Sequence, residues 1–178
     1  MAMESVILVD KNDVEIGTEE KMKAHQNGGI LHRAFSVFIF NGRGEMLLQQ
    51  RAEGKYHCGG LWTNTCCSHQ RPDESMEDAV HRKLKQEMGF DTKLKEIFKF
   101  IYRAQFGNGM TEHELDHVFV GRFDGKVVAN PDEAEGFRWA NIAEVGRDVA
   151  KNPELFTPWF RMVLDKVAEW YKENKGSL

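Results

Sequence analysis

The chain has 178 residues, of which 41% are hydrophobic and 11% aromatic, and its formal net charge is −4. This composition predicts one globular domain with its own core and argues against disorder. The negative charge argues against a broad nucleic-acid-binding surface, so an anionic ligand would need a few local cations.

The start of the chain shows no signal-peptide pattern, and no apolar run approaches the length of a bilayer span, so we expect a soluble, cytoplasmic protein. The three cysteines, Cys58, Cys66 and Cys67, do not have the spacing of a secreted disulfide framework. We therefore expect reduced thiols.

The first fifty residues are rich in strand patterns. Apolar residues and turn signals predict strands over residues 5–9, 14–17 and 34–40, and Asn41-Gly42 predicts a hairpin with a return strand over residues 45–50. Thr18 can cap a short helix that would place Lys21 and His25 on one face.

Residues 52–73 show no sustained periodicity, and an irregular segment of this length inside a compact domain is usually functional. Ser75 and the apolar stripe after it predict a helix that ends near Gly89. Glu87 lies near the C-terminus of this helix, where a carboxylate favours a neighbouring cation; a solvated side chain at the edge of the stripe is the alternative.

The remaining patterns predict strands over residues 97–103, 112–123 and 137–139, followed by a helix capped by Asn141 and a long amphipathic helix that begins at Pro158. The order of elements indicates the α+β class. In the second of these strands Glu112 and Glu114 share a face, where their charges repel unless a metal ion or a proton lies between them.

The segment from Gly59 to His69 places the thiol of Cys67 two residues from an imidazole in a loop rich in Gly, Thr, Asn and Ser. Such a loop before a helix is a candidate chemical site. The simpler alternative is that Cys66 and Cys67 pack in the core and that His69 is an ordinary loop histidine.

Three histidines and two glutamates could together hold a divalent ion. His25, His32, His69, Glu112 and Glu114 offer imidazole and carboxylate ligands that suit Mn²⁺, with Zn²⁺ and Mg²⁺ as rivals. They come from separate segments, so their spacing by itself also allows a binding protein with a structural zinc site.

Residues 68–90 resemble the Nudix signature G-x5-E-x7-R-E-U-x-E-E-x-G-U, in which U is bulky and apolar. Glu74, Arg82, Leu84, Glu87 and Gly89 match it. Three positions differ, because Ser68 replaces the first glycine and Lys83 and Gln86 replace two glutamates. Hydrolysis of a nucleoside diphosphate derivative, the usual Nudix activity, is therefore the second hypothesis.

The chain from about Val6 to Trp170 resembles type I isopentenyl diphosphate Δ-isomerases, a family with the Nudix fold. The matching segments are Lys21 to His25, Leu31-His32, Ala34 to Ser36, Gln50 to Lys55, Leu61 to Asn64, Cys67, His69, Tyr102 to Ala104, Glu112, Glu114 and Thr157 to Trp159. The resemblance implies one domain over residues 1–178, with a Nudix-like mixed β-sheet core, flanking helices, and additions at both ends.

The resemblance also implies two ion sites. His25, His32, His69, Glu112 and Glu114 would hold the divalent metal. Glu87 and the main-chain carbonyl of Cys67 would help to bind a Mg²⁺ ion that arrives with the substrate diphosphate.

The implied reaction moves a carbon–carbon double bond by adding a proton at C4 and removing one at C2. Cys67 and Glu114 would be the acid/base pair on opposite faces of the substrate, assisted by Tyr102. The aromatic ring of Trp159 could stabilise a carbocation by about 2 kcal/mol where water is excluded.

The resemblance assigns the diphosphate to a set of cations, Lys21, Arg51, Lys55 and Lys83. Lys83 takes the place of a usual arginine and keeps the charge without the planar fork. It implies no partner beyond the small-molecule diphosphate, and a monomer.

The other cysteines and histidines receive no role. Cys58 and Cys66 are expected to pack, and His57, His81, His113 and His117 to be surface or strand residues. A third hypothesis is a metal-stabilised binding module without catalysis.

Overall fold

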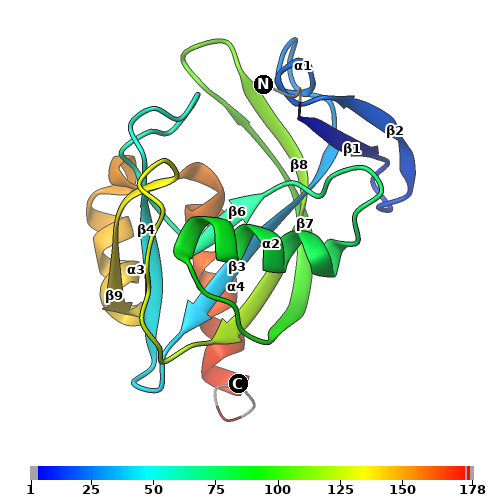
Figure 1. Cartoon of the computed structure of the whole chain (residues 1–178). Helices are drawn as coiled ribbons and strands as arrows, with labels where there is room; N and C mark the ends of the chain where they lie inside the picture. The colour runs from blue at the N-terminus through cyan, green and yellow to red at the C-terminus, as the bar shows by residue number, and fades with distance from the viewer. Residues whose placement is uncertain (1–3, 175, 177–178) are drawn as a thin grey trace.

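The computed structural model describes residues 4–174 and 176 (Figure 1). Nine strands and four α-helices follow one another among these residues. They are β1 (Ser5–Val9), β2 (Glu15–Glu20), α1 (Lys21–Ala24), β3 (His32–Phe40), β4 (Glu45–Arg51), β5 (Trp62–Thr63), β6 (Cys66–Ser68), α2 (Met76–Met88), β7 (Leu94–Gln105), β8 (Thr111–Arg122), β9 (Ala134–Asn141), α3 (Ile142–Lys151) and α4 (Pro158–Asn174), with a 3₁₀ turn at Pro153–Leu155.

Strand β3 is the centre of a mixed sheet. It pairs with β8 in parallel and with β1, β4 and β6 antiparallel. Strand β8 also pairs with β7, and β4 pairs with β5 and β9, so the sheet is continuous through all nine strands. The expected mixed sheet with flanking helices is confirmed.

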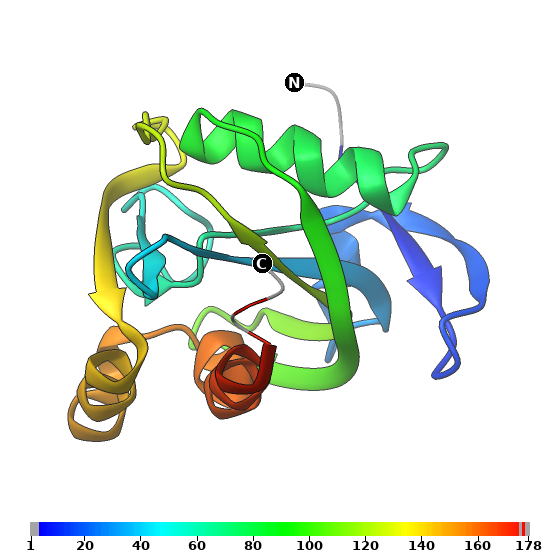
Figure 2. The ribbon, with the colours of Figure 1, turned by 90° about the horizontal axis from the view of Figure 1, so that it is seen from below.

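The two faces of the sheet carry separate cores because side chains alternate along each strand. Val37 and Ile39 of β3 pack with α2, whereas Phe38 and Phe40 pack with α4. Figure 2 shows α2 on one side of the sheet and α4 on the other. A mixed sheet buried on both faces explains the continuous apolar run of β3.

Helix α2 and the β3–β4 turn form where the capping and turn residues of the sequence predicted them. The Ser75 hydroxyl accepts from the Asp78 amide at 3.0 Å, and Gly89 ends the helix with φ of 74°. In the turn, the Gly44 amide donates to the Asn41 carbonyl at 2.9 Å. The Asn141 side chain caps α3, and Pro158 begins α4.

Two expectations about local structure were wrong. Thr18 lies in β2, opposite Ile7 of β1, and the cap of α1 is instead Glu20, whose carboxylate accepts from two amides of the helix. Because residue 18 is paired within the sheet, the helix begins only at Lys21, and Glu20 occupies the capping position. The segment 52–73, expected to be irregular, contains the short strands β5 and β6.

One face of β8 changes character along its length. Val118 and Val120 belong to the core beneath α4, but Glu112, Glu114 and Asp116 continue the same face in the other direction. A run of buried carboxylates at the end of an apolar core is costly unless each has a partner. This end of the sheet holds the candidate site. No helix of the described residues is long and apolar enough to cross a membrane.

Candidate functional site

Strand pairing brings the predicted site residues together from distant segments. In the β3–β8 register His32 lies opposite Glu114, and in the β7–β8 register Tyr102 lies opposite the same residue. The antiparallel pairing of β3 with β6 places Ser36 opposite Cys67. His25 ends helix α1, which sits at this edge of the sheet.

Three imidazoles surround one oxygen of Glu114. The Oε1 atom lies 2.9 Å from Nε2 of His69, 3.4 Å from Nε2 of His32 and 3.8 Å from Nε2 of His25. All four side chains are buried, and their ligand atoms lie within 4.8 Å of one another. We call these four residues the histidine cluster.

Backbone carbonyls fix the orientation of two of these rings. Nδ1 of His25 lies 2.7 Å from the Lys21 carbonyl, and Nδ1 of His32 lies 2.7 Å from the Ile30 carbonyl. A carbonyl can accept but cannot donate, so each Nδ1 carries the proton and donates it. Each Nε2 is thereby aimed at Glu114, the arrangement in which imidazoles bind metal ions.

Tyr102 joins the two glutamates. Its hydroxyl lies 2.6 Å from Oε2 of Glu114 and 2.9 Å from Oε2 of Glu112. Burial, reinforced by the two carboxylates, raises the pKa of Tyr102 well above its usual value, so the phenol stays protonated. Ser36 similarly donates to the next carboxylate of β8, Asp116, at 2.7 Å.

Burial and neighbouring side chains shift the pKa values of groups in and beside the cluster. Burial raises the pKa of Glu114, but the surrounding imidazoles outweigh it, and the net shift is well below the usual value. Burial and then the charge of Glu114 raise the pKa of Glu112. Burial lowers the pKa of His69 to about 3, which keeps that ring neutral. Burial lowers the pKa of His25, but its contacts with Glu114 outweigh burial and raise that pKa overall. An ionised carboxylate thus lies beside the neutral ring of His69.

These residues fit a divalent metal ion. The fit rests on two features of the cluster, the convergence of three Nε2 atoms on a carboxylate oxygen and the buried Nε2 of His25, which has no hydrogen-bond partner among the described residues. Imidazole and carboxylate together suit ions such as Mn²⁺ and Zn²⁺.

A cavity of about 210 Å³ opens beside the cluster. Cys67, Glu114, Tyr102 and Trp159 all line it, although they come from β6, β8, β7 and α4. Burial raises the pKa of Cys67 to about 12, so its sulfur carries a proton at neutral pH. The cavity therefore presents a thiol and an ionised carboxylate to the same small volume.

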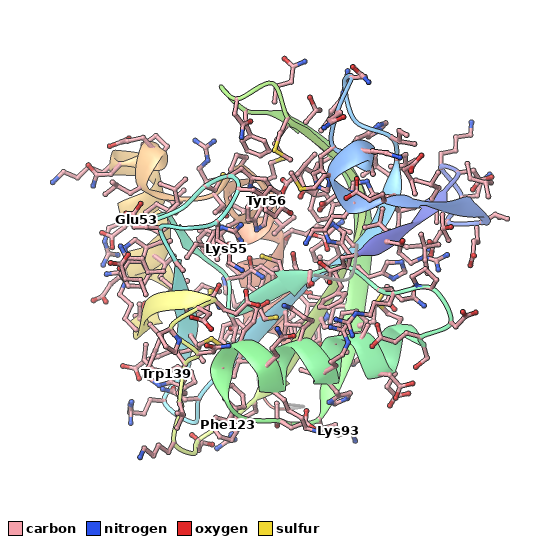
Figure 3. The ribbon with its side chains drawn as sticks, turned by 45° about the horizontal axis from the view of Figure 1, so that its top comes forward. Glu53, Lys55, Tyr56, Lys93, Phe123 and Trp139 are labelled. Atoms are coloured by element: carbon pink, nitrogen blue, oxygen red, sulfur yellow. The ribbon has the colours of Figure 1, made fainter. Side chains whose placement is uncertain are left out.

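The four predicted cations, Lys21, Arg51, Lys55 and Lys83, also line this cavity. We call them the cation cluster. In Figure 3 Lys55 lies on the loop after β4, over the centre of the molecule, while Lys93 and Phe123 lie at its periphery.

The lysines of the cation cluster are already paired. Lys21 contacts Glu4 at 3.0 Å, and Lys83 contacts Glu87 at 2.9 Å. Lys55 and Lys83 both contact Glu133, a cavity residue that sequence reasoning did not identify.

Glu87 is 4% exposed and also accepts from the Gln49 amide at 3.0 Å, so the alternative of a solvated Glu87 is wrong. The guanidinium of Arg51 lies 5.2 Å from the Trp159 ring centroid and donates to the His57 carbonyl at 3.3 Å.

The structure assembles the predicted residues in three groups. His25, His32, His69 and Glu114 form one, Cys67, Tyr102 and Trp159 line the cavity wall, and Glu87 belongs with the cations. Glu112 forms a second group with His25 and His57, in which its Oε1 lies 2.9 Å from Nε2 of His57.

His57 was expected to be a surface or strand residue, and that expectation is wrong, because it is buried in a loop. It is 7% exposed and lines the cavity. A lone loop histidine carries no spacing signal, and its burial depends on residues from other segments. His117 is a strand residue as expected, but it is buried and contacts Asp13 at 3.0 Å.

Comparisons with known proteins agree with this architecture. Residues 30–160 match the model of the NUDIX domain. A protein of Aromatoleum aromaticum named isopentenyl-diphosphate Delta-isomerase 2 is 52% identical over 92% of this chain and 86% of its own length. Isopentenyl-diphosphate Delta-isomerase 1 of the same organism is 48% identical over 97% of both chains.

A Burkholderia multivorans protein named isopentenyl-diphosphate Delta-isomerase is 48% identical over 92% of both chains. Among solved structures, a protein of Deinococcus radiodurans superimposes with a TM-score of 0.76 over 92% of this chain and 98% of that one, at 16% identity. The last similarity is evidence for the fold alone.

Proposed function

The chain belongs to the family of the isopentenyl-diphosphate Delta-isomerases, within the NUDIX domain family, and from this premise we propose that it interconverts isopentenyl diphosphate and dimethylallyl diphosphate. The observation that carries the proposal is the shared cavity, which Cys67 and Glu114 line together with the cation cluster.

The proposed reaction needs two proton transfers and no leaving group. A proton is added at C4, the double bond moves from C3–C4 to C2–C3, and a proton is removed from C2. The protonated thiol of Cys67 is suited to donate and the ionised Glu114 to accept, and the reverse reaction exchanges these roles. A forward turnover leaves Cys67 as a thiolate and Glu114 protonated, and proton exchange with water restores both groups before the next one.

Tyr102 holds Glu114 in position through the 2.6 Å hydrogen bond to Oε2. A protonated phenol at this distance leaves the carboxylate ionised and orients it toward the cavity. Trp159 lines the same cavity, where its ring could stabilise positive charge that develops at C3 by about 2 kcal/mol. Because water would trap such a charge as an alcohol, the burial of these residues also protects the reaction.

In this proposal the histidine cluster and Glu112 hold a divalent metal ion, Mn²⁺ before Zn²⁺ or Mg²⁺. When bound, the ion supplies positive charge that fixes Glu114 and tunes its pKa. The cation cluster binds the diphosphate, with Mg²⁺ shared by Glu87 and the Cys67 carbonyl. Lys83 serves here as a point charge in place of an arginine.

We further propose that residues 1–178 act as one domain, as a monomer in the cytoplasm, on a small-molecule diphosphate without nucleic acid or membrane. Hydrolysis of a nucleoside diphosphate derivative is the rival function. The position of Lys83 counts against it, because its ammonium pairs with Glu87 where the Nudix signature has a further glutamate.

The test is an assay of the purified chain with Mn²⁺ and Mg²⁺. We expect isopentenyl diphosphate to convert to an equilibrium mixture with dimethylallyl diphosphate, followed by proton NMR, without release of phosphate. Hydrolysis of nucleoside diphosphate derivatives without isomerisation would support the rival function. Metal binding without turnover of either substrate would support a binding module.

A further inference from the structure

His57 is held rigidly at the edge of the histidine cluster. Its ring stacks on Phe106 with a centroid distance of 4.5 Å and an interplanar angle of 4°. Trp159 meets it edge-on at 5.9 Å. Stacking on one face and an edge contact from a second aromatic leave the ring little freedom, so the positions of its nitrogens are determined by the fold.

Both ring nitrogens of His57 are buried and have no hydrogen-bond partner among the described residues. A buried polar atom without a partner costs free energy comparable to its desolvation. Packing alone does not explain this cost, since a phenylalanine would make the same ring contacts without it. A bound ligand would compensate for this cost.

Two candidate metal ligands, Glu112 and His25, lie close to His57. Nε2 lies 2.9 Å from Oε1 of Glu112, but the contact lacks the geometry of a hydrogen bond. Nε2 of His25, also buried and unpartnered within the described part of the chain, belongs to the same group, whose ligand atoms lie within 4.8 Å of one another. Atoms bound to one ion at about 2.1 Å approach each other in this way without hydrogen-bonding.

We propose that His57 is a further ligand of the divalent metal ion, placed on the side of His25 and Glu112. The inference rests on the metal role proposed above for the histidine cluster. It adds an imidazole to a site that would otherwise be completed by oxygen. Because imidazole suits Mn²⁺ and Zn²⁺ whereas Mg²⁺ prefers oxygen, His57 shifts the site toward the softer ions.

The test compares the parent with His57→Phe, which keeps a ring against Phe106 and Trp159 but removes both nitrogens. His81→Phe is the matched control, because His81 lies on α2, pairs with Asp91 and belongs to neither group of candidate metal ligands. Mn²⁺ and Mg²⁺ affinities are measured by calorimetry without substrate, and circular dichroism checks the fold. The imidazole nitrogens coupled to bound Mn²⁺ are counted by electron–nuclear double resonance.

We expect His57→Phe to bind Mn²⁺ about 10- to 100-fold more weakly, with a smaller loss for Mg²⁺ and one coupled nitrogen fewer, while His81→Phe matches the parent. An unchanged nitrogen count overturns the inference, whether or not affinity falls. A parent that binds no Mn²⁺ overturns the proposed metal role as well. If His57→Phe misfolds, the coupled nitrogens are counted in His57→Gln instead. The same loss of one nitrogen is expected there, and an unchanged count would overturn the inference.

Discussion

The histidine cluster and the cation cluster differ in how their charges are balanced. In the histidine cluster, an ionised Glu114 lies among three imidazoles, and Nε2 of His25 and Nδ1 of His69 have no hydrogen-bond partner among the described residues. In the cation cluster, each lysine contacts a carboxylate. The histidine cluster can thus accept an added cation. An anion that binds at the cation cluster must instead compete with Glu4, Glu87 and Glu133 for the lysines.

Replacement of Glu114 breaks the histidine cluster most directly. Glu114→Gln removes the charge on which three imidazoles converge and the proposed proton acceptor. We expect Mn²⁺ affinity to fall at least about 100-fold and turnover about 10²- to 10⁴-fold. Calorimetry and the isomerisation assay measure the two losses.

Glu96→Gln is the control, since Glu96 contacts His117 away from the cavity. It should bind metal and turn over substrate as the parent does. Retention of both properties in Glu114→Gln would remove Glu114 from its proposed roles.

Metal removal tests the histidine cluster without mutation. An ion that binds the folded chain at about 100 times its Kd adds about 2.7 kcal/mol to the free energy of unfolding. For a chain of this size, chelation should therefore lower Tm by about 5–10 °C, and Mn²⁺ should restore it. The measurement is thermal denaturation followed by circular dichroism, and an identical Tm with and without chelator would contradict a resident ion.

In the cation cluster we expect a smaller change, and one that strengthens substrate binding instead of weakening it. Glu133→Gln removes a carboxylate that contacts both Lys55 and Lys83, so the diphosphate no longer competes with it. A gain of about 1 kcal/mol in binding lowers KM about 5-fold with little change in kcat.

Glu135→Gln is the control for steady-state kinetics, because Glu135 is an exposed residue of β9, two positions after Glu133. A raised KM in Glu133→Gln would mean instead that Glu133 holds the lysines in position for the substrate.

The thiol of Cys67 lines the same cavity, and its pKa reports on its surroundings. Burial raises the pKa of Cys67 to about 12. Because the pKa is raised, the thiolate fraction grows about tenfold per pH unit between pH 7 and 10 without levelling. The rate of alkylation by iodoacetamide, read from the Cys67 peptide by mass spectrometry, should follow it. A plateau near pH 9 would show an ordinary thiol.

The sequence predicted best where its signals are local. Helix α2 has a cap, an apolar stripe and a terminal glycine within sixteen residues, and each of them acts as expected. Thr18 shows the limit of such signals, because pairing with Ile7 of a neighbouring strand overrode its capping tendency.

The candidate site follows the same rule. Residue types and family resemblance identified the imidazoles and carboxylates that the structure brings together. His57 and Glu133 could not be identified, because their burial and partners arise from contacts between segments far apart in the chain. Phe106, which stacks on His57, is 49 residues away, as the two residue numbers show.

The central claim is that Cys67 exchanges a proton with the substrate opposite Glu114. The adjacent cysteines allow a matched test, because Cys67 lines the cavity while Cys66 packs in the core beneath α2. In the isomerisation assay we predict that Cys67→Ala loses about 10²- to 10⁴-fold in kcat with Mn²⁺ binding intact, and that Cys66→Ala stays within a few-fold of the parent. Turnover of Cys67→Ala equal to that of Cys66→Ala would contradict the account.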